Sequence, residues 1–278
     1  MNSSSTSSTL STVAVIGANG KTGRKIVELL VNSNISTLAL TRDGLFNPNQ
    51  LQLHIDNINM DKLNINKVDV KDLINIVEVL KTSHICIFAA SSSKYGGTPY
   101  EVDQIGLINV AKACQFNKVI RLVIISSAAV TKKFSFINIF LNLFHHNIMN
   151  AKLEGEMEVR RLYSLLEPGS RLGYTIIRPG KLIDTNDESS KGCSNIELNQ
   201  GDNIVGDISY LDLAILCIES MNCMYTFNVT FECYYKNHGK SNVNFNIWDL
   251  FKLSTKNEGN VKRGEDYNQL FQGLITDF

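Results

Sequence analysis

The chain has no excess of charge and no long apolar run. Lys and Arg together number 27, as do Asp and Glu, so the formal net charge is zero. This balance argues against a nucleic-acid surface or a polybasic membrane anchor. No apolar run approaches the roughly 20 residues that a membrane-spanning helix needs, and no hydrophobic signal core precedes the first predicted strand. We therefore expect a cytoplasmic protein with no nucleic-acid partner and no membrane span.

Paired cysteine motifs are also missing. None of the six cysteines forms a C-x-x-C pair, and most lie inside apolar runs. This pattern indicates buried free thiols of a reducing compartment and argues against a disulfide framework. The six are Cys86, Cys114, Cys193, Cys217, Cys223 and Cys233.

No linker divides the chain. The first residues are rich in Ser and Thr, which predicts a disordered leader over 1–11. We expect one domain over 12–278, with a small C-terminal elaboration on the substrate side.

Strand-like and helix-like segments alternate through most of the sequence. Strands are predicted at 12–16, 36–42, 68–70, 84–90, 121–127 and 174–178, with helices at 24–31, 72–80, 100–117 and 151–166. Further on, a helix is predicted at 211–221, a strand at 226–235 and a last helix at 265–275. Continuous apolar strands separated by helices predict an α/β fold, a doubly wound parallel sheet of the Rossmann type.

The most informative motif is GANGKTG at 17–23, a G-x-x-G-x-x-G pattern. An apolar strand precedes it and an amphipathic helix follows it. Glycines in this context permit a tight turn and let the backbone approach a pyrophosphate at the start of a helix. The motif therefore predicts dinucleotide binding, although a purely structural glycine turn has the same pattern. Its predicted binding residues are Gly17, Asn19, Gly20, Lys21, Thr22 and Gly23.

Three later strand ends add to this site. Arg42 follows the second predicted strand, where NAD-binding proteins usually place an acidic residue and where Arg suits the 2′-phosphate of NADP(H). Asp69 and Val70 are expected to flank the adenine, and Ala89 and Ala90 are expected to let the backbone pass close to the cofactor. Each could also be an ordinary strand-end residue. The sequence favours NADP (NADPH) as the cofactor.

Several motifs in order resemble those of the atypical or extended short-chain dehydrogenase/reductase superfamily, and in particular its NmrA-like NAD(P)-binding group. The resemblance rests on 17–23, 126–127, 151–156, 174–180 and 208–214, and more loosely on 265–271, so it covers nearly the whole chain.

In that superfamily a Tyr is the general acid, a Lys four residues later lowers its pKa and binds the ribose, and a Ser orients the substrate oxygen. The resemblance assigns the Ser to Ser127 and the Lys to Lys152. The Tyr position is occupied by Ile148, which cannot exchange a proton. Lys152 can still bind the nicotinamide ribose, although a surface Lys is the alternative.

The resemblance also implies that Ser126, Arg178 and Pro179 contact the cofactor, with Arg178 and Pro179 shaping the nicotinamide side. A turn with a solvated Arg is the alternative at Arg178. The segment 134–149 is unusually apolar and lies between the fifth predicted strand and the Lys helix. It is interpreted as an apolar substrate wall or a partner surface, or as a helix packed on the core.

Other groups could donate the missing proton. His145 and His146 precede the Lys helix, and His has a suitable pKa. Tyr95, Lys152 itself, or a water held by Ser127 are further candidates. A conjugated acceptor such as a quinone or flavin needs none of them, because it can take its proton from solvent.

Two functions therefore stay open. One is an NADP(H)-dependent oxidoreductase acting on a small substrate with an apolar or aromatic portion, with Ser127, Lys152 and His145 as its candidate catalytic residues. The other is a non-catalytic NADP(H)-binding redox sensor or scaffold that regulates a protein partner. Ile148 favours the second, and the retained Ser127 and Lys152 favour the first.

Overall fold

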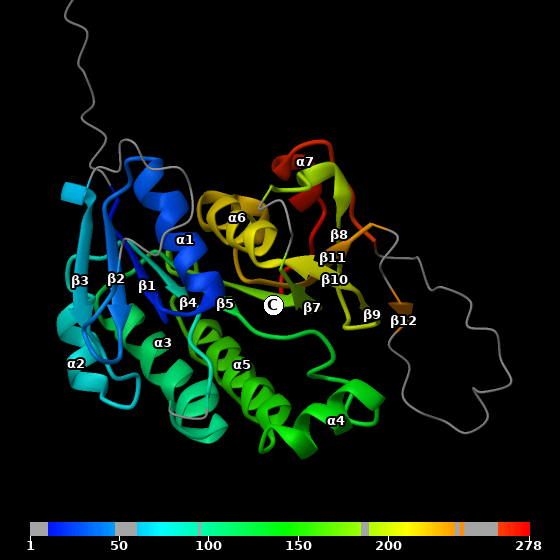
Figure 1. Cartoon of the computed structure of the whole chain (residues 1–278), viewed down its shortest axis with the longest axis horizontal. Coiled ribbons are helices and arrows are strands. Elements are labelled where there is room, and N and C mark those ends of the chain that lie inside the picture. Colours follow the sequence, from blue (N-terminus) through cyan, green and yellow to red (C-terminus); the bar gives the residue numbers. More distant parts are fainter. Residues whose placement is uncertain (1–10, 48–59, 94–95, 185–188, 237–239, 242–260) are drawn as a thin grey trace, which may run out of the picture.

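A central sheet of eight strands organises the molecule (Figure 1). The computed structural model describes residues 11–47, 60–93, 96–184, 189–236, 240–241 and 261–278. Within these residues, seven neighbouring strands are parallel and the eighth is antiparallel at one edge. Across the sheet the order is β3 (Leu63–Lys67), β2 (Thr37–Thr41), β1 (Val13–Ile16), β4 (Ile85–Phe88), β5 (Arg121–Ile125), β6 (Gly173–Pro179), β11 (Val229–Tyr235) and β8 (Ile196–Asn199).

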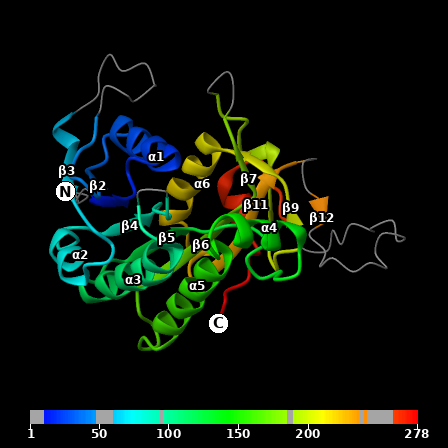
Figure 2. The same ribbon diagram turned by 60° about the horizontal axis from the view of Figure 1, so that its bottom comes forward.

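Helices cover both faces of this sheet (Figures 1 and 2). One face is covered by α1 (Lys21–Asn32) and α6 (Tyr210–Asn222). The other is covered by α2 (Leu73–Val79), α3 (Leu107–Phe116) and α5 (Ile148–Ser164). The remaining helices are α4 (Phe136–Phe144) and α7 (Tyr267–Phe271), and a π-helical segment, η3 (Tyr100–Gly106), leads into α3. The described helices include none that is long and apolar enough to cross a bilayer.

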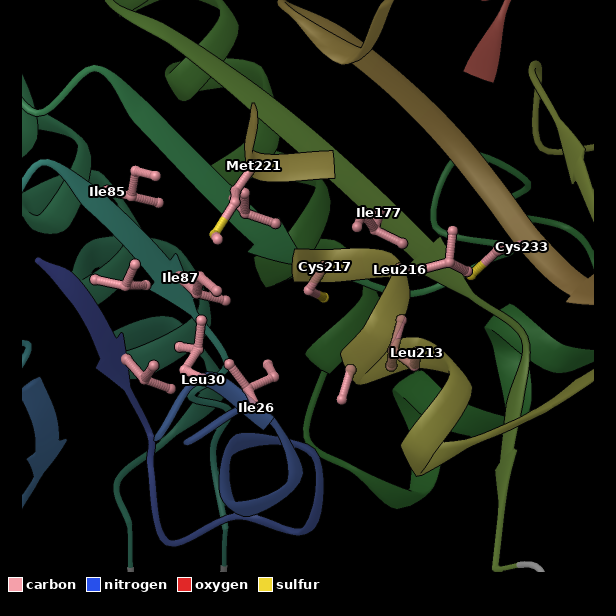
Figure 3. Close-up of a cluster of buried hydrophobic side chains, with 14 of the residues drawn as sticks. Ile26, Leu30, Ile85, Ile87, Ile177, Leu213, Leu216, Cys217, Met221 and Cys233 are labelled. Atoms are coloured by element: carbon pink, nitrogen blue, oxygen red, sulfur yellow. The ribbon is translucent and has the colours of Figure 1, made fainter. Parts of the chain in front are cut away.

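The sequences of the inner strands are continuous apolar runs because both faces of the sheet are buried. The inner parallel strands lie between two helix layers, so nearly all their side chains are buried, and the edge strand β3 is the exception. Figure 3 shows one of these layers, in which Ile26 and Leu30 of α1 and Cys217 of α6 lie over Ile87 of β4. All four are fully buried. The predicted doubly wound α/β fold is confirmed.

Short strands beyond β6 form the C-terminal elaboration. β7 (Lys181–Ile183) pairs in parallel with β10 (Asp207–Ser209), and β9 (Ile204–Val205) pairs with β12 (Lys240–Ser241). None of these was predicted from the sequence, nor was the antiparallel β8. The last helix is also shorter than the predicted 265–275. The predicted leader lies outside the described residues except for residue 11.

The prediction of the third strand at 68–70 was wrong. The strand is β3, Leu63–Lys67, and Val68 and Val70 follow it as buried loop residues. β3 is an edge strand, with Asn64, Asn66 and Lys67 exposed. Because one side of an edge strand is solvated, its sequence is polar and lacks the apolar run of a buried strand.

The strand order creates a crevice at the carboxyl end of β1. The chain leaves β1 for β2 and β3 on one side and returns to β4 on the other. At such a reversal point the loops after the two central strands separate, and ligands of open α/β sheets bind between them. The glycine motif follows β1, and Ala89 and Ala90 follow β4.

Candidate functional site

The turn after β1 requires glycine at its first position. Gly17 has φ of +85°, a left-handed conformation that L side chains rarely adopt. A Cβ on Gly17 would lie 2.7 Å from the Ala90 nitrogen and 2.8 Å from the Ala89 carbonyl carbon. The turn therefore lies directly against the backbone that follows β4, at the centre of the crevice.

The same glycines bring the start of α1 close to the turn. A Cβ on Gly23 would lie only 2.2 Å from the Gly17 carbonyl oxygen. Gly20 is the N-cap of α1 and has no side chain with which to cap the first turn. N–H groups at a helix start carry partial positive charge and bind anions.

A cavity of about 350 Å³ opens at this turn. It brings together residues from the ends of three strands and the glycine turn. Of the predicted cofactor residues, those that line it are Gly17, Asn19, Gly20, Arg42, Asp69, Val70, Ala89 and Ala90. The absence of side chains at the glycines leaves room for a dinucleotide whose pyrophosphate lies against the start of α1.

Two charged residues follow β2 at the cavity wall. Arg42 is exposed, and its Nη1 lies 2.8 Å from where a Cβ on Gly96 would be, so the guanidinium lies close to the Gly96 backbone. The neighbouring Asp43 accepts a hydrogen bond from the Leu45 N–H at 3.0 Å. That hydrogen bond lowers the pKa of Asp43 and keeps it ionised. One carboxylate oxygen of Asp43 is therefore bound to its own loop.

Among the described residues that line this cavity, three predicted residues of the glycine motif are absent: Lys21, Thr22 and Gly23. Lys21 Nζ is 2.7 Å from Asp184 and lies over the ring of Tyr210. The hydrogen bond to Asp184 raises the pKa of Lys21. Thr22 is buried, and Gly23 is needed for the close approach to Gly17. Lys21 therefore connects α1 to the segment after β7.

Lys152 belongs to a buried polar cluster that the sequence did not predict. Its Nζ lies 2.8 Å from Asp103, whose side chain is fully buried in η3. Asp103 also accepts hydrogen bonds from the Ser91 hydroxyl at 2.7 Å and the Ser92 N–H at 2.9 Å. Burial by itself raises the pKa of Asp103, but Lys152 and these hydrogen bonds outweigh it, so the pKa is lowered.

Through Ser91, which lines the cavity, this cluster connects Lys152 to the cofactor crevice. Asp103 was missed because nothing in the sequence marks one acidic residue of a helix as buried. The available signal was Gly155, where a Cβ would lie 2.7 Å from the Asp103 carbonyl oxygen. A helical glycine three residues after the Lys indicates that another segment passes close to α5.

The segment after β5 that contains Ser126 and Ser127 is hydrogen-bonded alongside the end of β6. The Ser126 N–H donates to the Ile177 carbonyl at 2.8 Å, and the Ala128 N–H donates to the Pro179 carbonyl at 2.9 Å. Ser126 is buried, and Ser127 is half-buried with its hydroxyl donating to the Ala128 carbonyl at 3.1 Å. The described lining of the 350 Å³ cavity does not include Ser126, Ser127 or Pro179.

Arg178 lies elsewhere, within a buried ionic cluster. Its guanidinium donates to both oxygens of Glu156, at 3.1 and 2.6 Å, and to Glu232 at 3.1 Å. Burial lowers the pKa of Arg178, but Glu156 outweighs burial and raises it. For Glu232 burial dominates and raises the pKa to about 7. The structure therefore does not bring Arg178 to the cofactor cavity, because its donors are bound to two glutamates.

The predicted alternative proton donors also lie apart from the cavity lining in the described part of the chain. His145 and His146 are exposed and follow α4. Tyr95 lies outside the described residues. Ile148 is the first residue of α5 and packs against Ala129, Val130 and Met149. None of these candidate donors that the structure describes lines the cavity, whose titratable lining residues are Arg42, Asp43 and Asp69.

Known proteins resemble this chain in sequence or in fold. An uncharacterized chloroplastic protein of Arabidopsis thaliana is 29% identical over 175 residues, which span 59% of this chain and 57% of that protein. A short-chain dehydrogenase/reductase of Veillonella parvula in complex with NADP superposes with a TM-score of 0.62 at 12% identity, covering 84% of this chain and 99% of that one. The oxidoreductase ylbE of Lactococcus lactis superposes with a TM-score of 0.63 at 16% identity, covering 81% and 91%.

The structural likenesses show the fold, and the sequence profile shows the family. Residues 17–223 match the NAD(P)H-binding family, starting at the first glycine of the turn and extending past α6. The family match confirms the prediction of a nicotinamide nucleotide site and does not distinguish NAD(H) from NADP(H). The chain belongs to the NAD(P)H-binding family, in agreement with its resemblance to the atypical short-chain dehydrogenases/reductases.

Proposed function

We propose that this protein is an NADP(H)-dependent oxidoreductase that reduces a small conjugated acceptor without a tyrosine acid. The observation that carries the proposal is the 350 Å³ cavity, which has the glycine turn at one part of its wall and Arg42 at another. An anion site at a helix start and an arginine after β2 match the pyrophosphate and the 2′-phosphate of one NADP(H) molecule.

In this proposal the roles are shared between residues of the cavity wall and two residues outside its described lining, Lys152 and Ser127. Arg42 binds the 2′-phosphate, and Asp69 and Val70 flank the adenine. Lys152, held 2.8 Å from Asp103, binds the ribose hydroxyls next to the nicotinamide. Bound NADPH supplies a hydride. Ser127 orients the acceptor oxygen, and water supplies the proton, because Ile148 has none to give.

A binding experiment tests the choice of cofactor. We expect Arg42→Ala to weaken NADPH binding about 10- to 100-fold and to leave NADH binding nearly unchanged, because only NADPH has the 2′-phosphate. Calorimetric titration measures both affinities. Arg161→Ala is the matched control, since Arg161 is an exposed arginine of α5 paired with Glu158. Unchanged NADPH affinity in Arg42→Ala would show that the 2′-phosphate assignment is wrong.

Turnover tests the oxidoreductase itself. Purified protein is mixed with NADPH and a panel of quinones, flavins and aldehydes, and the loss of NADPH absorbance is followed. We expect turnover with at least one quinone or flavin, and a loss of about tenfold or more in kcat/KM for Lys152→Met. Lys112→Met, an exposed lysine on α3, is the control and should keep full activity.

A second function competes with this one. Ile148 stands at the usual acid position, and the Lys152 ammonium is already neutralised by Asp103. Both observations favour a redox sensor or scaffold that binds NADP(H) without turning it over and regulates a protein partner. Tight NADPH binding together with no turnover on any acceptor in the same panel would support this second function and contradict the first.

A further inference from the structure

The helix α4 presents its apolar side chains to solvent. Among its nine residues only Asn138 is buried. Phe136 is 72% exposed, Leu143 74% and Phe144 61%. Large apolar side chains usually face the core of a soluble domain, so this helix is oriented in reverse. α4 therefore packs against the protein through Asn138 and Leu141 and leaves most of its apolar side chains exposed.

Hydrogen bonds from the polar side of α4 attach it to the protein, together with the half-buried Leu141. The Asn138 amide donates to the carbonyls of Ala129 and Val130 at 2.8 and 3.2 Å. Asn142 donates to Asn138 at 2.8 Å and accepts from the Met149 N–H at 2.9 Å. Ser135 caps the helix through the Asn138 N–H. These bonds fix the orientation of α4, so the exposure of its apolar face is built into the fold.

The apolar face comprises Phe136, Ile139, Phe140, Leu143 and Phe144. Ring contacts link its aromatic members in sequence, since Phe140 lies 6.1 Å from Phe136 and 4.5 Å from Phe144 between ring centroids. In Figure 1 the helix lies at the periphery, beyond the start of α5. The face is therefore a continuous apolar ridge at the edge of the molecule.

Basic residues border this ridge at both ends. Lys132 and Lys133 precede the helix, and His145 and His146 follow it. No Asp or Glu occurs in the sequence between Asp103 and Glu154. Asp202 contacts Thr131 but is buried, so the charged side chains that the segment around α4 itself contributes are the two lysines.

We propose that α4 binds the surface of an anionic lipid bilayer, lying in the plane of the interface. Phe and Leu side chains on one helix face insert at the boundary of headgroups and acyl chains, and flanking lysines contact anionic headgroups. A helix of nine residues is about 14 Å long, less than half the thickness of the hydrocarbon core, so it lies on the membrane and does not span it. Protein interfaces also have apolar cores, so the choice of a bilayer depends on the two lysines that precede the ridge.

Vesicle co-sedimentation of the full chain tests this proposal. One set of vesicles is phosphatidylcholine, and the other contains about 30% phosphatidylserine, which supplies the negative surface potential. We expect binding to the second set, weakened about tenfold or more by Phe140→Ser/Leu143→Ser and to a similar extent by Lys132→Gln/Lys133→Gln. Phe116→Ser is the control, because Phe116 is also 74% exposed but lies on α3. NADPH affinity, unchanged in every variant, shows that the fold is intact.

The possible results separate lipid from protein. Binding that is lost in both double variants and kept in Phe116→Ser supports the proposal. Failure of the wild-type chain to sediment with anionic vesicles, or equal binding by the Phe140→Ser/Leu143→Ser variant, overturns it. Light scattering that shows a dimer of the wild-type chain, with a monomeric double variant and no vesicle binding, would assign the ridge to a second copy and also overturns it.

Discussion

Replacement of Gly17 by alanine is expected to abolish measurable NADPH binding, with a loss of at least about a hundredfold in affinity. The added methyl group would lie 2.7 to 2.8 Å from the Ala89–Ala90 backbone, which cannot move without displacing β4. The turn would have to shift away from β4 and with it the start of α1. Calorimetric titration with NADPH measures the loss.

A matched control separates this clash from backbone strain. Gly169 has φ of +83°, almost the value of Gly17, but a Cβ there has no atom within 4 Å among the described residues. Gly169→Ala should reduce the free energy of unfolding by about 1 kcal/mol, the cost of a left-handed alanine, and leave NADPH affinity unchanged. If Gly17→Ala also bound NADPH normally, the phosphate site would have to lie elsewhere.

Replacement of Arg178 by methionine is expected to cost about 3 to 5 kcal/mol of unfolding free energy. It would leave Glu156 and Glu232, whose side chains are at most 1% exposed, without their shared cation. Arg160 still contacts Glu156 at 3.0 Å but does not replace the contact with Glu232. Urea denaturation measures the change. Arg161→Met, which breaks an exposed pair, should cost less than about 1 kcal/mol.

The loss in Arg178→Met should grow as the pH rises. Burial already raises the pKa of Glu232 to about 7 in the presence of Arg178, and loss of this cation raises the folded-state pKa of Glu232 further above its unfolded-state value. The folded state then holds more protons, so its stability falls with rising pH, most steeply from about pH 5 to pH 8. NADPH affinity of the folded variant should stay unchanged. A large drop in affinity with normal stability would instead restore the sequence-based prediction that Arg178 contacts the cofactor.

The sequence was sufficient for the parts of the site that depend on local backbone geometry. The glycine spacing specifies a turn and a helix start, and strand ends at Arg42, Asp69 and Ala89 meet because parallel strands end at one edge of the sheet. Their common cavity therefore followed from the fold. The ion pairs between side chains of different elements could not be predicted from the sequence in this way. Nothing in the sequence near Arg178 indicates that Glu156 and Glu232, from two other elements, bind its guanidinium.

The same limit applies to Lys152 and α4. Lys152 was correctly placed on the helix after β5, but its partner Asp103 lies on a different segment, 49 positions earlier in the sequence. The apolar run at 134–149 was interpreted as a substrate wall or a partner surface, or as a helix packed on the core. Its orientation depends on two asparagines that bind backbone carbonyls, and periodicity alone cannot tell which side of a helix is attached.

The polar edge strand β3 also affects how copies of this protein behave toward one another. An open strand edge offers unpaired N–H and C=O groups to any other strand, and long apolar edges aggregate. Asn64, Asn66 and Lys67 keep β3 hydrated, and a lysine is costly to desolvate against a neighbouring chain. At the opposite edge, β8 is bridged through Leu198 to Lys262 of the same chain. The polar residues that prevented the prediction of β3 from the sequence therefore also disfavour pairing of β3 with a strand of another molecule.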